Sequence, residues 1–317
     1  MRPASLLALL LVACAATRPT SGEPIAASTA IRKAIPPAAA PALPSVPRGG
    51  VHRVTVDGRG EQRFAYVHVP RDYDPATPTP TILVFHGGKG SSTAAQNFSR
   101  TWASMYDQGM ILVFPNGQDR DREETAWISR DARDTRDVDH VRALLSHLGQ
   151  SYNIDPERMY AAGFSNGGIM TIMLACHAPE MFAGFAVFSQ TVHKHIAADC
   201  TPTIRRPVLY LAGTAEKHWP GRHFSHSAME TVAWWRDELD CPLQPTSIET
   251  LPDGPDRTSV QRSIWAPCGK AAAFEFLRVE NGAHFWPGPG LAPAAGRCTD
   301  IDGATEVRRF FQAYAGL

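Results

Sequence analysis

Short runs of apolar residues, each about as long as one strand, recur along most of the chain. They lie at 81–85, 110–114, 159–162, 182–188 and 207–211. Strands without polar alternation are typical of a parallel sheet that is covered on both faces. We therefore expect these runs to be the central strands of such a sheet.

The segments around these runs show other periods. Residues 51–56 and 63–69 alternate apolar and polar positions, which predicts half-buried strands. The remaining predicted elements are helices at 93–107, 136–151, 167–177 and 225–239, a last strand at 273–279 and a last helix at 304–315. Strands that alternate with helices indicate a doubly wound α/β domain, which we place at 50–317.

The N-terminus has the pattern of an export signal at 1–13. Arg2 supplies a positive charge, and the apolar stretch that follows is shorter than the roughly 20 residues that span a bilayer. The tetrapeptide Leu11-Val12-Ala13-Cys14 resembles a bacterial lipobox, which predicts an acylated Cys14 and a lipid anchor in the membrane. The alternative is a plain secretory signal cut after Ala13, Ala15 or Ala16. Both predict an exported protein, either in the cell envelope or secreted.

Residues 14–49 are rich in Ala, Pro, Ser and Thr. Prolines at this density prevent helices and sheet ladders, so this segment is predicted to be an extended tether between the anchor and the domain.

Charge and cysteine content add two constraints. Lys and Arg number 31 and Asp and Glu number 31. This balance, without a basic stripe, gives no electrostatic reason to expect nucleic acid as a partner. Of the six cysteines, five follow Cys14, and an odd number leaves at least one thiol outside any disulfide within the chain.

The strongest chemical signal is the sequence Gly163-Phe164-Ser165-Asn166-Gly167-Gly168. It matches the pattern G-x-S-x-G, follows a predicted strand and opens a predicted helix, which is the context of a nucleophile elbow. The glycines leave room for the sharp turn that exposes the Ser165 hydroxyl. We therefore predict an α/β-hydrolase fold, with a mostly parallel sheet and Ser165 as nucleophile. An ordinary glycine-rich turn is the non-catalytic alternative.

A serine hydroxyl needs a base to take its proton, and in this fold the order along the chain is Ser, acid, His. His284 lies in a glycine-rich loop between the last predicted strand and the last helix, where the base is expected. Glu216 follows the strand at 207–211 and is the predicted acid, which would orient His284. Asp240 is the second choice, because it lies at the end of a predicted helix. A solvated loop position is the alternative for both Glu216 and His284.

Two backbone N–H groups should stabilise the charge that develops on the carbonyl oxygen of the substrate. The predicted donors are Asn166, directly after the nucleophile, and Gly88, in the loop after the strand at 81–85. The stretch 87–92 looks like a phosphate-binding loop, but it does not satisfy G-x-x-x-x-G-K-[ST].

Together these motifs resemble the α/β-hydrolase group of secreted polyhydroxybutyrate depolymerases and feruloyl and acetylxylan esterases. The resemblance runs from about Val51 to Ala315 and is carried by His86-Gly87, 152–158 leading into 163–168, Leu174-Ala175-Cys176, Gly213-Thr214-Ala215 and 284–288. It implies a triad of Ser165, Glu216 and His284 that acts on an ester substrate without a cofactor. It also implies the disulfides Cys241–Cys268 and Cys176–Cys200, which would leave Cys298 free.

The chain departs from this family pattern in three places. The family usually has Asp at the position of Glu216 and His at the position of Ala212, and it has Gly-His-Thr-Trp-Pro where this chain has Ala283-His284-Phe285-Trp286-Pro287. The first change concerns the acid, and the last alters the rim of the site.

Two further groups of residues are candidates for binding. Trp127 and Trp286 fall in predicted loops, where they would bind substrate by stacking on a sugar or ferulate ring. The histidines that cluster around Glu216 fit no standard zinc spacing, so we predict no metal; they are His193, His195, His218, His223 and His226.

We therefore expect a serine carboxylic-ester hydrolase that works through an acyl-enzyme. Its expected substrates are polyhydroxybutyrate-type esters, feruloyl or acetyl esters of polysaccharides, or their oligomers. One alternative is a non-catalytic surface-binding lipoprotein on a hydrolase fold, and Glu216 is its only support. The other alternative is a peptidase or thioesterase.

Overall fold

The computed structural model describes residues 49–58, 60–90, 102, 105–118, 125–128, 131–217, 219–288 and 295–317. The predicted export signal, Cys14, nearly all of the tether, most of the helix expected at 93–107 and His218 lie outside these residues. Within the described part of the chain, no helix is long and apolar enough to cross a membrane.

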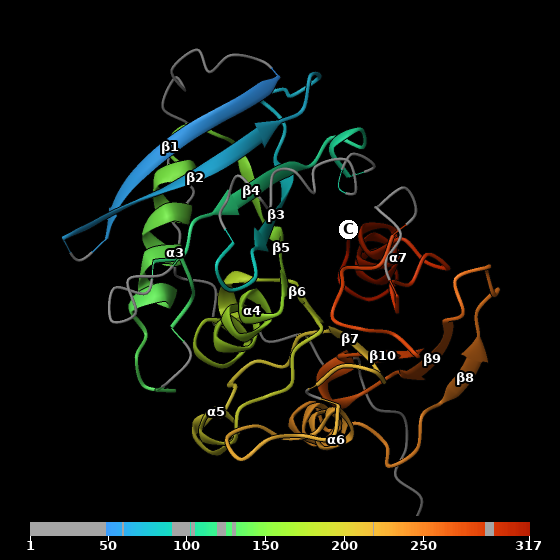
Figure 1. The fold of residues 1–317 in the computed structure, drawn as a ribbon. Coiled ribbons are helices and arrows are strands. Elements are labelled where there is room, and N and C mark those ends of the chain that lie inside the picture. Colours follow the sequence, from blue (N-terminus) through green and yellow to red (C-terminus); the bar gives the residue numbers. More distant parts are fainter. Residues whose placement is uncertain are drawn as a thin grey trace, which may run out of the picture. The chain divides into compact units, whose positions relative to one another are not determined.

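One sheet of ten strands forms the centre of the domain, in the order β1-β2-β4-β3-β5-β6-β7-β10-β9-β8 (Figure 1). The strands are β1 (Gly50–Gly58), β2 (Glu61–Val69), β3 (Thr79–Phe85), β4 (Ile111–Pro115), β5 (Ile154–Phe164), β6 (Gly184–Phe188), β7 (Val208–Gly213), β8 (Ser247–Thr250), β9 (Ser259–Trp265) and β10 (Phe274–Glu280). The six strands from β4 to β10 in this order are parallel, and antiparallel pairs flank them on both sides.

Each apolar run in the sequence forms one of the central strands, as predicted. The strands β8 and β9 were not predicted. All four residues of β8 are exposed, so this edge strand has no apolar signal. Its place is set by pairing with β9, in which Ser247 lies opposite Ile264.

Helices cover both faces of the sheet. The helices are α3 (Arg136–Leu148), α4 (Asn166–His177), α5 (Lys194–Asp199), α6 (Ala228–Glu238) and α7 (Gly303–Tyr314), with short 3-10 turns at Pro179–Met181 and Gly269–Ala271. Buried side chains of α3, α4 and α6 belong to one apolar cluster, and those of α7 belong to a second. The two clusters lie on opposite faces, since they take alternate residues of the same strands, such as Leu83 and Val84. The sheet is therefore doubly wound.

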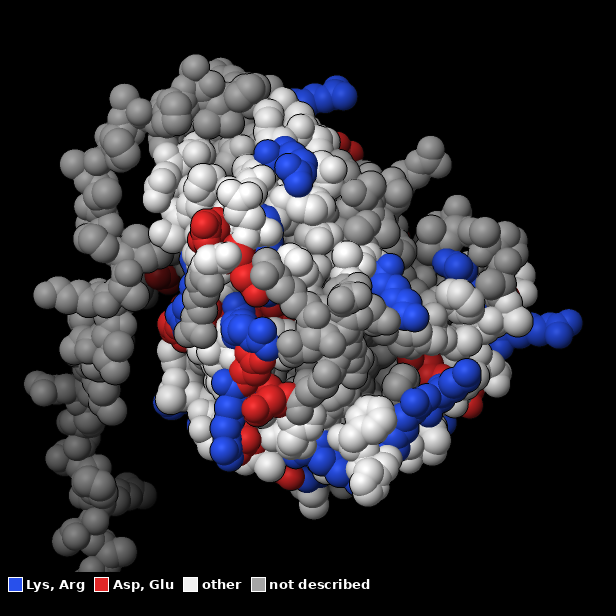
Figure 2. All heavy atoms as spheres, turned by 60° about the vertical axis from the view of Figure 1, so that its left-hand side comes forward, with Lys and Arg blue, Asp and Glu red and all other residues white. Residues whose placement is uncertain are grey.

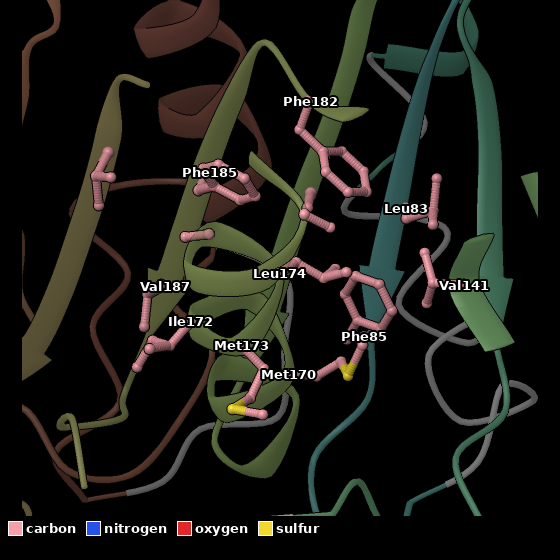
Figure 3. Close-up of a cluster of buried hydrophobic side chains, with 14 of the residues drawn as sticks. Leu83, Phe85, Val141, Met170, Ile172, Met173, Leu174, Phe182, Phe185 and Val187 are labelled. Atoms are coloured by element: carbon pink, nitrogen blue, oxygen red, sulfur yellow. The ribbon is translucent and has the colours of Figure 1, made fainter. Parts of the chain in front are cut away.

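Helix α4 lies at the centre of the larger cluster and is apolar all round. Every residue from Gly167 to Cys176 is buried, as expected of a helix that is covered on all sides. Figure 3 shows Met170 and Leu174 on the side of Phe85, and Ile172 beside Val187, all within one apolar cluster. Each such buried side chain contributes roughly 2 kcal/mol relative to an exposed one. This packing fixes the start of α4 against the sheet.

Both disulfides implied by the family resemblance are present. Cys176–Cys200 joins the last turn of α4 to the end of α5, and Cys241–Cys268 joins the residues after α6 to those before β10. Cys298 is buried and unbonded.

Candidate active site

Ser165 lies in the turn between β5 and α4, at the carboxyl edge of the parallel strands. Its backbone has φ 55° and ψ −123°, and its N–H donates to the carbonyl of Phe188 at 2.9 Å. A positive φ is uncommon for a residue with a side chain and persists only where the surroundings enforce it. Here the turn is the strained strand-to-helix junction that a nucleophile elbow requires.

Glycines on both sides of Ser165 make this turn possible. A Cβ added at Gly163 would lie 2.1 Å from the carbonyl oxygen of Gly167. A Cβ added at Gly167 would lie 2.2 Å from the carbonyl oxygen of Phe85. The first turn of α4 therefore approaches β5 and β3 so closely that only glycine fits at these two positions.

His284 connects the serine to a carboxylate. Its Nε2 lies 2.9 Å from the Oγ of Ser165, and its Nδ1 lies 2.8 Å from the Oε2 of Glu216. With the proton on Nδ1, the imidazole donates to Glu216, and Nε2 is left to accept the proton of the hydroxyl. The three predicted residues therefore form one hydrogen-bonded chain.

Glu216 is a buried carboxylate, with 5% of its surface exposed. Its second oxygen, Oε1, accepts from the N–H of Gly213 at 2.9 Å, so both oxygens are engaged. Asp240, the second choice for the acid, lies at the end of α6 beside Gly269. Of these two carboxylates, Glu216 is the one that contacts His284.

The loops that carry Glu216 and His284 are bonded to each other. The N–H of Ala215 donates to the carbonyl of Gly282, and the N–H of Thr214 donates to the carbonyl of Val279, both at 2.9 Å. A Cβ at Gly213 would lie 2.2 Å from the Gly282 oxygen. Because β7 and β10 are parallel neighbours, their carboxyl ends bring Glu216 and His284 together.

The two predicted oxyanion donors lie next to each other. A Cβ added at Gly88 would be 3.6 Å from the Cβ of Asn166. No acceptor among the described residues takes the backbone N–H of either residue. The Asn166 N–H also belongs to the first turn of α4, where the helix dipole favours negative charge.

Trp127 and Trp286 do not have the solvent-facing positions that substrate stacking would need. Trp127 is 0% exposed, and its indole N–H donates to the carbonyl of His86 at 3.0 Å. Trp286 is 5% exposed and stacks on Phe188, with ring centroids 4.3 Å apart. Each indole is therefore buried against other residues of the protein, and the prediction that they stack on a substrate ring is corrected.

His86 is a part of the site whose role the sequence did not specify. It is buried, and its Nε2 accepts from the N–H of Gly117 at 2.9 Å while Nδ1 lies 2.8 Å from the carbonyl of Gly87. Burial lowers the pKa of His86, with the Gly87 carbonyl acting against this shift. Through these two contacts the ring joins Gly117 to the loop that carries Gly88.

Two carboxylates and a thiol lie close together outside the histidine cluster. Among the described residues, one group has ligand atoms close together, namely Asp256, Cys298 and Asp300. Both carboxylates are engaged in hydrogen bonds with Thr258. Burial raises the pKa of Asp256, but hydrogen bonds from Thr258 and Thr299 outweigh it and lower the pKa to about 2. This group joins the loop at 253–258 to the segment at 298–300.

Charged side chains on the face drawn in Figure 2 lie in mixed groups, with basic residues next to acidic ones. Ion pairs of the described residues include Arg136–Asp134 at 2.7 Å and Arg142–Glu180 at 2.6 Å. Pairs of this kind on a surface contribute little to stability. The mixed pattern matches the balanced composition.

Fold and site together define an α/β-hydrolase. Residues 59–270 match the Esterase family, described as "Putative esterase". This match covers more than half of the chain, and the chain therefore belongs to that family and is a carboxylic-ester hydrolase.

Three relatives illustrate the similarity. Putative esterase NocK of Nocardia uniformis subsp. tsuyamanensis is 30% identical over 296 residues, which cover 80% of this chain and 83% of that protein. The bifunctional acetylxylan esterase/xylanase XynS20E of Neocallimastix patriciarum is 24% identical, over 71% of this chain and 31% of that protein. The poly(3-hydroxybutyrate) depolymerase of Ralstonia pickettii is 32% identical, over 36% of this chain and 26% of that protein. The chain thus spans about a third or less of the last two.

A solved structure agrees with the fold. The acetyl xylan esterase from Aspergillus awamori has a TM-score of 0.63 and 15% identity, covering 83% of this chain and 99% of that one. At this identity the likeness concerns the fold alone.

Proposed function

We propose that this esterase is a serine hydrolase that works through an acyl-enzyme. The observation that supports the proposal most strongly is the chain of hydrogen bonds from Ser165 through His284 to Glu216, at 2.9 and 2.8 Å. A serine is a weak nucleophile unless a base is within reach, and this arrangement supplies one with a partner that orients it.

In the proposed reaction, the Oγ of Ser165 attacks the ester carbonyl while His284 takes its proton. The carbonyl oxygen becomes an oxyanion and accepts from the N–H groups of Asn166 and Gly88. His284 then gives the proton to the leaving alcohol, which leaves the acyl group on Ser165. Water, activated by His284, releases the acid. Glu216 keeps the proton of the neutral imidazole on Nδ1 and stabilises the imidazolium in each half-reaction.

We propose that the substrates are acetyl or feruloyl esters of polysaccharides, or 3-hydroxybutyrate oligomers. The names of the relatives support the acetyl and hydroxybutyrate choices. The side chain of His284 is 38% exposed, which suits an ester presented by a chain that remains outside the protein. Release of acetate from acetylated xylo-oligosaccharides, of ferulate from methyl ferulate and of 3-hydroxybutyrate from its oligomers tests these classes side by side. The class with the highest kcat/KM identifies the substrate.

The general activity is tested with p-nitrophenyl acetate and butyrate. We expect the purified protein to hydrolyse both, and the Ser165→Ala variant to hydrolyse neither above background. Equal activity of wild type and Ser165→Ala would contradict the proposal. A wild type that hydrolyses amides or thioesters faster than esters would instead favour the peptidase or thioesterase alternative.

We also propose that the protein is exported and anchored through Cys14. The two disulfides support export, since such bonds persist in oxidising compartments. Mass spectrometry of the mature N-terminus is the test. An acylated N-terminal Cys14 is expected, and an N-terminus beyond Cys14 would point to a plain secretory signal.

A further inference from the structure

The side chain of Asn166 makes a reciprocal contact with the backbone of Trp127. Its Oδ1 accepts from the N–H of Trp127 at 2.6 Å, and its Nδ2 donates to the carbonyl of the same residue at 3.1 Å. This amide therefore joins the start of α4 to the segment Thr125–Ile128. Asn166 is also the residue whose backbone N–H is the first proposed oxyanion donor.

The same segment also bonds to the residues on either side of the Gly87-Gly88 pair, whose Gly88 N–H is the second proposed donor. The indole N–H of Trp127 donates to the carbonyl of His86 at 3.0 Å, and the N–H of Lys89 donates to the carbonyl of Thr125 at 3.0 Å. His86 and Lys89 flank the Gly87-Gly88 pair along the chain. The ring of Trp127 also packs edge-on against Phe85, at the end of β3.

The far end of the segment is fixed in the core. The N–H of Ile128 donates to the Oδ2 of Asp137 at 2.6 Å. The other oxygen of Asp137 pairs with Arg63 of β2. Both residues are buried, with 2% of Asp137 and 4% of Arg63 exposed. A hydrogen-bonded ion pair that is buried in this way holds its members in one geometry. The segment therefore has a rigid attachment to α3 and β2.

We propose that the segment Thr125–Ile128 positions both oxyanion donors, with the Asn166 side chain and the Trp127 indole as its contacts to them. These are positioning residues: their side chains act through the backbone N–H groups of Asn166 and Gly88. The proposal rests on the proposed function, because the alignment of the donors matters only when an oxyanion forms. Misplacement of such groups by 1 Å costs about 100-fold in rate.

Three variants test this assignment. Asn166→Ala removes the amide but keeps the backbone N–H, and Trp127→Phe removes the indole N–H but keeps an aromatic ring. Trp265→Phe is the matched control. Trp265 is also buried, but it lies opposite Phe274 at the start of β10, away from the site, and its indole N–H has no partner among the described residues.

The expected result is a split between kcat and KM for p-nitrophenyl butyrate. We expect kcat to fall about 10- to 100-fold for Asn166→Ala and less for Trp127→Phe, with KM changed by less than about threefold, because the contacts act on the transition state. The inhibition constant of an alkyl boronic acid, whose tetrahedral adduct places an oxygen between the two donors, should rise in parallel. Trp265→Phe should change none of these constants. Wild-type kcat and boronic acid affinity in Asn166→Ala would overturn the proposal.

Amide hydrogen exchange gives a measurement that does not depend on activity. In Asn166→Ala, exchange at Trp127 and Lys89 should accelerate, while exchange in α7, on the other face of the sheet, stays unchanged. Unchanged exchange at Lys89 would overturn the positioning role even if the wild type hydrolysed no ester. Absence of hydrolysis by the wild type would contradict the proposed function instead, so the two failures are distinguishable.

Discussion

The Nε2 of His284 lies 2.9 Å from the Oγ of Ser165, although 119 residues separate the two in the sequence. Ser165 is held by the tight turn before α4, and His284 is held by a loop whose backbone is bonded to the loop of Glu216. Two independent parts of the fold therefore converge on one hydrogen bond, and the proposed chemistry depends on both.

Glu216→Gln should reduce kcat for ester hydrolysis by roughly 10³- to 10⁴-fold with little change in KM, because an amide does not hold the imidazole tautomer or stabilise the imidazolium. Asp240→Asn is the control, since Asp240 is the other acid that the sequence offered. Steady-state kinetics on p-nitrophenyl butyrate decide between them. A large loss in Asp240→Asn with a normal Glu216→Gln would reverse the assignment of the acid.

The elbow should tolerate no side chain at Gly163. In Gly163→Ala, the added Cβ would lie 2.1 Å from a backbone oxygen, so we expect a loss of about 3 kcal/mol or more in unfolding free energy. Gly149→Ala is the matched control: Gly149 has φ −63°, and its added Cβ would meet nothing closer than 3.4 Å. Denaturant unfolding should show that this second variant is unchanged or slightly more stable. Equal stability of both variants would contradict the packing described for the elbow.

The disulfide Cys176–Cys200 should stabilise the domain measurably. It closes a loop with a sequence separation of 24, for which the chain-entropy model gives about 3.5 kcal/mol. The double variant Cys176→Ala/Cys200→Ala should therefore unfold at lower denaturant concentration than the wild type under oxidising conditions. Cys298→Ala, which removes the unbonded thiol, should shift the unfolding midpoint clearly less. A larger shift for Cys298→Ala than for the double variant would be evidence against a structural role for the disulfide.

Acid should destabilise the fold through His140. Burial, followed by the charge of Arg63, lowers the pKa of this histidine from 6.5 to about 4, with Glu61 acting in the opposite direction. Below pH 6.5 the unfolded chain takes up a proton that the folded state refuses. The unfolding free energy therefore falls as pH drops from about 6.5 to about 4, by up to about 3 kcal/mol from this group. His140→Gln should flatten this dependence in denaturant unfolding across that range, and an unchanged slope would contradict it.

The sequence predicted the central strands because an apolar run is a local signal. It predicted Ser165 and His284 because the elbow motif and the order of the triad fix where each lies relative to the sheet. It missed β8, whose four residues are all exposed and whose place depends on a distant partner strand.

The positions of Trp127 and Trp286 show the limit of such predictions. A tryptophan in a predicted loop faces solvent or core depending on segments that lie far away in the sequence. Trp127 is covered by β3 and His86, and Trp286 is covered by Phe188 of β6. The residues next to each tryptophan along the chain carry no information about this burial. The contact between Trp127 and Asn166 likewise emerges only when α4 is placed on the sheet.

The most direct test of the central claim is to locate the covalent adduct of a fluorophosphonate by peptide mass spectrometry, with Ser165→Ala and His284→Ala beside the wild type. Our account predicts one adduct per chain, on Ser165, absent from Ser165→Ala and formed much more slowly in His284→Ala. An adduct on another residue, or none on a wild type that hydrolyses p-nitrophenyl butyrate, would contradict the assignment of Ser165 as nucleophile.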